Sequence, residues 1–176
     1  DPFRDFSKLA KHFNPFQRAH RAISESAKVG EGSVIQPNVF LGNNVKIGKN
    51  CLIHPNVVIY DGCTIGNNVT IHAGTILGSD AFYYKNRETG FDKLESCGSI
   101  IIEDNVDIGA SCTIDRGVTG NTHIKEGTKI DNQVHVGHDT TIGKHCFKFS
   151  TFTIYIRLRN LVIACFAMLQ RCFVIT

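Results

Sequence analysis

Long hydrophobic runs are missing from this sequence, and so are paired cysteines. No stretch of 18 consecutive apolar residues occurs, so we do not expect a membrane-spanning helix. The 7 cysteines are odd in number and form no Cys-x-x-Cys pair, so neither a disulfide framework nor a zinc ribbon is expected. The chain starts without methionine and without an apolar leader, which is typical of a fragment or a processed form.

A strong excess of charge of one sign is also missing. The net charge is +3, and the basic residues that produce it lie at the two ends of the chain. Residues 1–28 carry six bases and three acids, and residues 147–176 carry four bases and no acid. The segment between them has nine bases and thirteen acids. A basic groove is therefore not expected, and nucleic acid is excluded as a predicted partner.

What the sequence does contain is a repeat with a period of six residues. Aliphatic residues recur ten times in succession without a slip, and the same phase resumes twice later in the chain. A period of six fits neither an α-helix nor simple alternation along one strand. The aliphatic column consists of Ile23, Val29, Ile35, Leu41, Ile47, Ile53, Ile59, Ile65, Ile71, Leu77, Ile102, Ile108, Ile114, Ile124, Ile130, Val136 and Ile142.

A second column stands four residues after the first and holds only small or β-branched residues, while Gly, Asn and Asp often fill the positions between. Short strands bounded by Gly and Asn turns explain both columns. Three hexads make one triangular coil, and the coils stack through sheet hydrogen bonds. We therefore predict an all-β fold over residues 23–146, a parallel β-helix of five to six coils and about 25–29 Å in length. The second column includes four cysteines that we expect to be buried, namely Cys51, Cys63, Cys112 and Cys146.

The segment before the repeat, residues 1–22, predicts a short amphipathic helix followed by a linker. Asp1 can cap the helix, and Pro2 is tolerated in its first turn. We expect the helix to pack on the first coil. Its apolar residues at helical spacing are Phe3, Phe6, Leu9 and Phe13.

Two further segments interrupt the repeat, and a third ends it. Residues 78–101 form a long insertion, which predicts a projecting loop that covers a substrate or a neighbouring subunit, or alternatively a hairpin packed on itself. Residues 115–123 stretch the spacing and predict a bulge at a coil corner. Residues 147–176 form a divergent tail without Gly or Pro, which predicts a capping strand or helix, or else a non-native continuation.

Histidines cluster near the end of the repeat. His138 stands two residues after the core residue Val136, so it should lie at a surface turn, with Asp139 beside it. A histidine on a rigid scaffold suits general-base catalysis because its pKa lies near the operating pH. From the residues alone, a surface histidine in a turn without a catalytic role is the favoured explanation.

Four stretches resemble one family, the UDP-3-O-acylglucosamine N-acyltransferases of the hexapeptide-repeat superfamily. GSDAFYY (78–84) resembles the family's GSDGFGY-like loop entry, and IGASCTIDRG (108–117) resembles its IGACTTIDRG-like motif. IDNQVHVGHDTTIG (130–143) is similar to its IDNQ-x-x-x-H-x-x-x-IG motif, and DPFRDFSKLAKHFNP (1–15) is similar to the helix that precedes its β-helix. The resemblance covers about residues 1–146 and implies a left-handed parallel β-helix.

The resemblance also implies the reaction. A 3-hydroxyacyl group would pass from acyl carrier protein to the 2-amine of a UDP-3-O-acylglucosamine, a lipid substrate linked to a UDP-sugar, in lipid A biosynthesis. The family is a homotrimer with active sites between subunits and needs no cofactor other than the carrier-protein thioester. His138 matches the general base, and no metal site is implied. The residues that match or adjoin substrate-contacting motifs are Asn132, Gln133, Asp139, Phe82, Tyr83 and Tyr84.

Two departures from the family pattern leave alternatives open. The family's uridine-recognition domain has no counterpart here, and Ile156 stands where the family places a glycine amide at the oxyanion. One alternative is therefore a catalytically impaired β-helix with a structural or partner-binding role. A UDP-N-acetylglucosamine O-acyltransferase and a trimeric carbonic anhydrase are more distant alternatives. The expected compartment is the cytoplasm for a bacterial source, and a mitochondrion is the alternative for a eukaryotic one.

Overall fold

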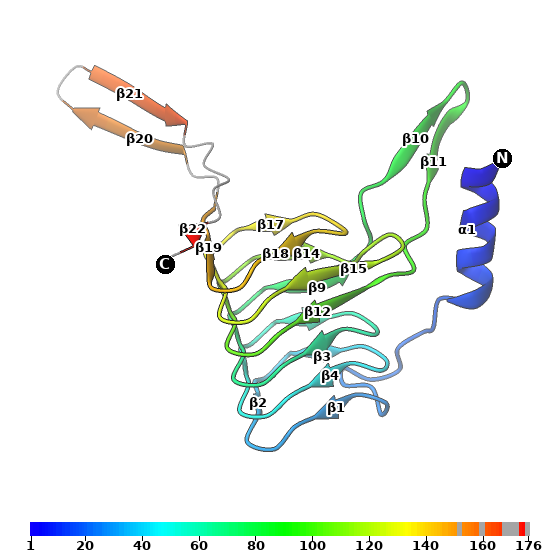
Figure 1. Ribbon diagram of the computed structural model, residues 1–176, viewed down its shortest axis with the longest axis horizontal. Coiled ribbons are helices and arrows are strands. Elements are labelled where there is room, and N and C mark those ends of the chain that lie inside the picture. Colours follow the sequence, from blue (N-terminus) through cyan, green and yellow to red (C-terminus); the bar gives the residue numbers. More distant parts are fainter. Residues whose placement is uncertain (151–152, 159–160, 167–172, 175–176) are drawn as a thin grey trace.

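The structure is a computed structural model that describes residues 1–150, 153–158, 161–166 and 173–174. It is a parallel β-solenoid with one short N-terminal helix, consistent with a left-handed β-helix of hexapeptide repeats (Figure 1). Within the described residues, no helix is long and apolar enough to cross a membrane.

Three parallel sheets form the three faces of the solenoid, and two hairpins lie outside them (Figure 1). The first face contains β1 (Lys28–Val29), β4 (Lys46–Ile47), β7 (Thr64–Ile65), β12 (Ser99–Ile102), β15 (Asn121–Ile124) and β18 (Thr141–Ile142). The second contains β2 (Val34–Ile35), β5 (Leu52–Ile53), β8 (Thr70–Ile71), β13 (Asp107–Ile108), β16 (Lys129–Ile130) and β19 (Cys146–Lys148). The third contains β3 (Phe40–Leu41), β6 (Val58–Ile59), β9 (Ile76–Ser79), β14 (Thr113–Asp115) and β17 (His135–Val136).

The register of the sheets follows directly from the hexad. Lys28 pairs with Lys46 and Ile53 pairs with Ile71, so each regular coil takes 18 residues, or three hexads. Every aliphatic residue of the repeat from Leu41 to Ile142 is at most 4% exposed, and together they fill the interior. The four cysteines of the second column are buried among them, as predicted. Burial raises the pKa of Cys63 to about 12, so this thiol stays protonated and serves packing.

The corners of the coils need a backbone conformation that few side chains tolerate. Among the residues that the structure describes, ten other than glycine have a positive φ, and six of these are asparagine, whose short side chain suits the left-handed region. These six repeat at the same place in the hexad, three residues after the aliphatic one. They are Asn38, Asn44, Asn50, Asn56, Asn68 and Asn105.

The N-terminal helix α1 (Pro2–Phe13) is confirmed, with Asp1 capping it by accepting a hydrogen bond from the Phe3 N–H. Its predicted packing on the first coil is wrong. The helix lies alongside the solenoid, beside the inserted loop (Figure 1), where Lys11 pairs with Glu95 at 3.0 Å. The physical reason is charge complementarity, because the loop presents carboxylates to the basic residues of α1. The first coil stays open instead, and Ile23 is 45% exposed.

The inserted loop contains an antiparallel hairpin of β10 (Tyr84–Arg87) and β11 (Gly90–Lys93) that projects from the solenoid (Figure 1). The second interruption does produce the predicted bulge, since the register shifts between Ile114 and Asp115. Beyond residue 150 the structure describes the backbone of β20 (Thr153–Leu158), β21 (Leu161–Phe166) and β22 (Phe173–Val174). β20 and β21 pair with each other, and β22 pairs antiparallel with β19.

Candidate active site

His138 lies on the turn between β17 and β18, the corner where the third face meets the first. Its side chain is 30% exposed, as expected for a surface turn. The next residue, Asp139, has a φ of 54° and makes the turn. The hexad therefore fixes the backbone of His138 on a rigid corner while leaving its ring open to solvent.

The ring of His138 is oriented by its neighbour. Its Nδ1 lies 2.9 Å from the Oδ2 of Asp139. Burial, the largest influence on Asp139, opposes ionisation, yet hydrogen bonds from the Val118 N–H, His138 and the Gly120 N–H outweigh it and lower the pKa of this carboxyl. An ionised carboxylate only accepts hydrogen bonds, so Nδ1 must carry the proton. The Nε2 atom of the neutral ring is then left with a free lone pair, which a general base requires.

The break in the repeat holds Asp139 in place. The Val118 N–H donates to its Oδ2 at 2.9 Å, and the Gly120 N–H donates to its Oδ1 at 3.2 Å. Both amides belong to the residues that stretch the hexad spacing. Gly117 allows this loop to approach, because a Cβ there would lie 2.8 Å from the Asp139 Oδ1. The irregular loop thus supplies two backbone donors that a regular hexad would not offer.

The inserted loop reaches the same corner with one of its three predicted aromatic residues. The ring of Tyr83 meets that of His138 edge to face, with centroids 5.7 Å apart and planes at 70°. Phe82 is 85% exposed and contacts Tyr84, with ring centroids 4.9 Å apart. Of the predicted site residues, the structure therefore gathers His138, Asp139 and Tyr83 and leaves Phe82 and Tyr84 on the surface.

Asn132 and Gln133 lie at a different corner, on the turn between β16 and β17, where the second face meets the third. The Oδ1 of Asn132 accepts the Ala110 N–H at 2.7 Å, and Gln133 makes the turn with a φ of 58°. Both are exposed. Within one chain, these two residues are not brought together with His138.

A second polar cluster on the third face was not predicted from the sequence. The buried Asp115 accepts a hydrogen bond from Ser79 at 2.9 Å, and its other oxygen lies 3.7 Å from the Nε2 of His135. The Nδ1 of His135 lies 2.9 Å from the Thr113 hydroxyl. The 3.7 Å separation is too long for a hydrogen bond, so Asp115 does not orient His135 as Asp139 orients His138. No sequence signal points to this cluster, because the stretched hexads set the pairing of Thr113 with His135 across neighbouring rungs.

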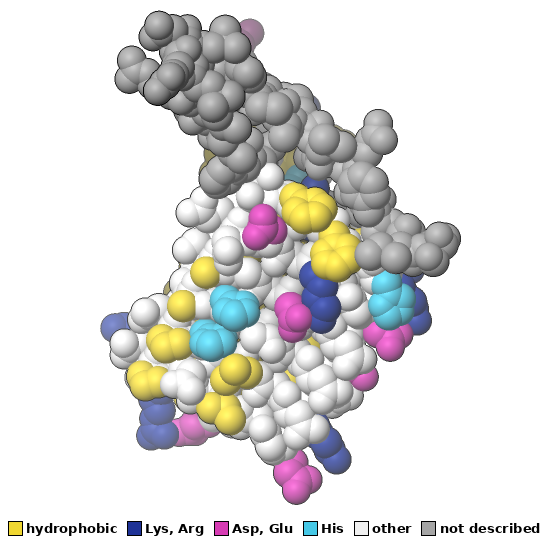
Figure 2. Space-filling model, turned by 90° about the vertical axis from the view of Figure 1, so that its left-hand side faces the viewer, with side chains coloured by type: hydrophobic (Ala, Val, Ile, Leu, Met, Phe, Trp, Pro, Cys, Tyr) yellow, Lys and Arg dark blue, Asp and Glu magenta, His cyan; other side chains and the backbone are white. Residues whose placement is uncertain are grey.

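Three further histidines lie on other parts of the solenoid and have contacts of their own. His123 lies 2.8 Å from Glu103, and His54 stacks on His72 with ring centroids 4.7 Å apart. Figure 2 shows a face of the solenoid on which two histidine side chains lie side by side near hydrophobic side chains, with an acidic and a basic side chain next to them. In the part of the chain that the structure describes, no three His, Cys, Asp or Glu residues converge as a metal site would need.

Comparisons with known proteins agree with this architecture. The family model for "Bacterial transferase hexapeptide (six repeats)" matches residues 44–79, and that for "Hexapeptide repeat of succinyl-transferase" matches residues 99–119. Among solved structures, the UDP-N-acetylglucosamine acyltransferase of Francisella novicida is similar, with a TM-score of 0.58 and 29% identity. That similarity covers 71% of this chain and 45% of the other.

Curated relatives are more similar in sequence. A UDP-3-O-acylglucosamine N-acyltransferase of Helicobacter hepaticus is 54% identical over 128 residues, which are 72% of this chain and 39% of the relative. That of Fusobacterium nucleatum is 47% identical over 152 residues, or 76% of this chain and 46% of the relative. The chain thus spans less than half the length of these relatives. It is a hexapeptide-repeat protein homologous to the bacterial proteins named UDP-3-O-acylglucosamine N-acyltransferase.

Proposed function

We propose that this chain belongs to an N-acyltransferase that moves a 3-hydroxyacyl group from acyl carrier protein to the 2-amine of UDP-3-O-acylglucosamine, a step of lipid A synthesis. Its homologues and structural neighbours are named acyltransferases, which supports acyl transfer as the reaction class. The observation that carries the proposal is the His138–Asp139 pair. An ionised carboxylate on Nδ1 leaves Nε2 free to accept a proton.

The chemistry follows from that geometry. The amine nitrogen attacks the thioester carbonyl, and Nε2 of His138 removes a proton from the nitrogen as the new C–N bond forms. The tetrahedral intermediate then collapses, the C–S bond breaks, and the imidazolium returns the proton to the departing thiolate. Asp139 stabilises the imidazolium between these two steps because its negative charge lies on the opposite nitrogen. The products are an amide and a free thiol, and no cofactor is consumed.

The predicted site residues lie at two different corners of the solenoid, which bears on how many subunits form the site. Asn132 and Gln133 lie one corner before His138 along the coil, and a second solenoid packed against this one would allow a single substrate to contact both kinds of corner. This supports the homotrimer that the family resemblance implies, with the acceptor sugar between subunits. Phe82 and Tyr84, exposed at the base of the hairpin, are then placed to meet the substrate or the neighbouring subunit.

The same relatives bear on the proposed compartment. The curated relatives described above come from bacteria, which supports the cytoplasm of a bacterial cell and gives no support to a mitochondrial location.

The test is acyl transfer from a 3-hydroxyacyl carrier protein to UDP-3-O-acylglucosamine, measured on this chain and on its His138→Ala variant. Loss of the base should lower kcat by about 10²–10⁴-fold. The matched control is His145→Asn, because His145 is a histidine at another corner of the solenoid and has a positive φ, a conformation that Asn tolerates. This control should keep parental activity.

Absence of turnover in the parent chain, in the presence of all substrates and with the solenoid folded, would favour the impaired, partner-binding alternative. Equal activity in the parent and in His138→Ala would reject His138 as the base.

A further inference from the structure

We infer that Tyr83 is a positioning residue for His138, and that helix α1 holds Tyr83 in place through Phe3 and a network of ion pairs. The inference rests on the proposed role of His138 as the base. It assigns a function to the two segments that the repeat does not explain, the N-terminal helix and the inserted loop.

The ring of His138 needs a second restraint. It stands on an exposed turn, and its hydrogen bond to Asp139 fixes Nδ1 without closing the remaining space around the ring. Tyr83 fills part of that space, with its ring edge to face at 5.7 Å. Such aromatic pairs favour one relative orientation. Tyr83 and Asp139 together therefore define the direction of the free Nε2.

Tyr83 is itself held from two sides. Its backbone lies at the root of the hairpin, where its carbonyl accepts the Leu94 N–H at 2.9 Å. Its ring stacks against Phe3 of α1, with centroids 6.3 Å apart and planes at 28°. The guanidinium of Arg87 and the ammonium of Lys85 lie 5.8 and 5.9 Å from the Phe3 ring centre, within the range of cation–π attraction.

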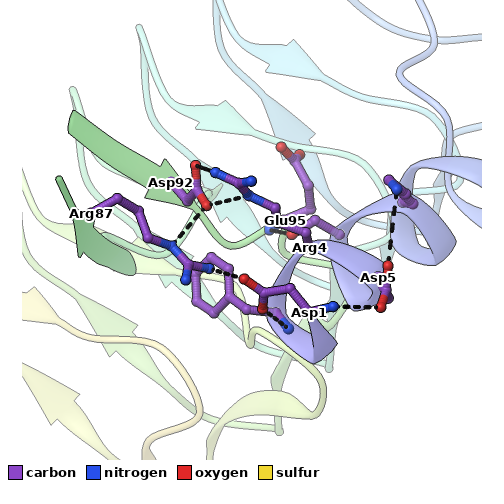
Figure 3. A network of polar contacts seen from close by, with 9 residues as sticks. Asp1, Arg4, Asp5, Arg87, Asp92 and Glu95 are labelled. Atoms are coloured by element: carbon purple, nitrogen blue, oxygen red, sulfur yellow. Dashed lines mark hydrogen bonds and ion pairs between the residues drawn. The ribbon is translucent and has the colours of Figure 1, made fainter. Parts of the chain in front are cut away.

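A network of ion pairs fastens α1 to the hairpin at this point (Figure 3). Arg4 of α1 donates from Nε to the Oδ2 of Asp92 at 2.7 Å and from Nη2 to its Oδ1 at 3.3 Å. Arg87 donates to the same Oδ2 at 3.0 Å and also pairs with Asp1 at the start of the helix. A single exposed ion pair contributes little, but two arginines that share one carboxylate across two elements restrict both.

These contacts form one continuous path from the helix to the base. Arg4 and Arg87 meet on Asp92, Phe3 meets Tyr83, and Tyr83 meets His138. Since a displacement of about 1 Å at a reacting atom costs on the order of 10²-fold in rate, loosening this path should lower kcat.

The test uses NMR of the full chain with ¹⁵N- and ¹³C-labelled histidine, together with acyl-transfer kinetics. In Tyr83→Gly, the ring proton signals of His138 should lose the ring-current shift from Tyr83 and move toward those of an exposed histidine. We expect kcat to fall about 10-fold while KM changes less than twofold. Tyr83→Phe keeps the ring, so it should retain the parental NMR signals of His138.

The role of α1 needs variants away from the loop. Arg4→Gln and Phe3→Ala should move the His138 signals in the same direction as Tyr83→Gly, by a smaller amount. Lys8→Gln is the matched control, because Lys8 lies on the same helix but does not pair with the hairpin. Among the described residues, its ion-pair partner is Asp5 of the same helix, at 3.9 Å. It should leave the His138 signals unchanged.

Unchanged His138 signals in Tyr83→Gly would overturn the inference. If the His138 signals shift in Tyr83→Gly but in neither Arg4→Gln nor Phe3→Ala, the role assigned to α1 is overturned. If the signals move as expected but the parent chain transfers no acyl group, the contact path stands and the proposed function fails.

Discussion

At the scale of single residues, Asp139 has two separate functions. It makes a turn with positive φ, and it orients the ring of His138. Six equivalent turns use asparagine, which suits this conformation at least as well. The turn alone therefore gives no reason for an aspartate here. The carboxylate is explained by the three groups that donate to it, which are two backbone amides and the His138 ring.

Asp139→Asn separates these two functions. The variant should fold normally, because asparagine makes the same turn elsewhere in the chain. Its amide can donate to Nδ1 of His138, which moves the ring proton to Nε2 and removes the base. We expect kcat/KM for acyl transfer to fall on the order of 10²-fold or more. Asn44→Asp, at the equivalent turn of an earlier coil, is the control and should leave kcat/KM unchanged. Equal rates for both variants would contradict the orienting role.

The site could be predicted only in part, because the sequence does not show how strands of neighbouring coils align where the repeat is interrupted. The motif around residue 138 and its neighbour could be read from the sequence. The amides of Val118 and Gly120 could not, because they reach Asp139 only after the stretched hexads change the spacing between rungs. Thr113 pairs with His135, 22 residues on, where a regular coil takes 18. No periodicity shows which atoms such an insertion brings together.

At the scale of elements, the sequence predicted the strands well and the placement of the helix poorly. The strands of the solenoid could be predicted from the aliphatic residue that recurs every six positions. That residue and the small residue four positions later are the ones that fill the interior. The helix follows from its own spacing and cap. Its packing partner depends on Arg4 and Asp92, exposed charges 88 residues apart, and no periodic pattern links them. The same holds for the contact between Tyr83 and His138.

The position of a rung in the stack should decide how much its core residue stabilises the fold. Ile108 is fully buried and lies between Ile71 and Ile130 on the neighbouring rungs. Ile108→Ala should therefore lower the free energy of unfolding by about 2–5 kcal/mol. Ile23→Ala is the matched control, because Ile23 belongs to the same column but lies at the open end. It should cost less than half as much. Urea unfolding followed by circular dichroism measures both, and equal losses would contradict a continuous core.

At the scale of the whole molecule, carboxylates join successive coils at the corners. Asp104 accepts the Asn67 N–H at 2.7 Å, and this backbone hydrogen bond is the main cause of its lowered pKa. Glu103 accepts the Glu126 N–H at 2.9 Å, which lowers its pKa in the same way. Asp139 adds a third such contact between coils. The stack is thus held by ionised groups at its surface as well as by its apolar interior.

This arrangement predicts that the stack weakens in acid. A carboxyl whose pKa is lower in the folded state stabilises that state above its unfolded pKa, about 4, and the contribution disappears as pH falls through the folded value. We expect the urea midpoint to be constant from pH 7 to about pH 5 and to fall steeply below about pH 4. Asp104→Asn should reduce this fall, because its amide accepts the Asn67 N–H at every pH. Asp5→Asn is the control, because the Asp5 carboxylate makes no hydrogen bond to a neighbouring coil. In this variant the urea midpoint should fall in acid as it does in the parent chain. A midpoint that falls equally in all three proteins would show that the carboxylates between coils do not cause the acid sensitivity.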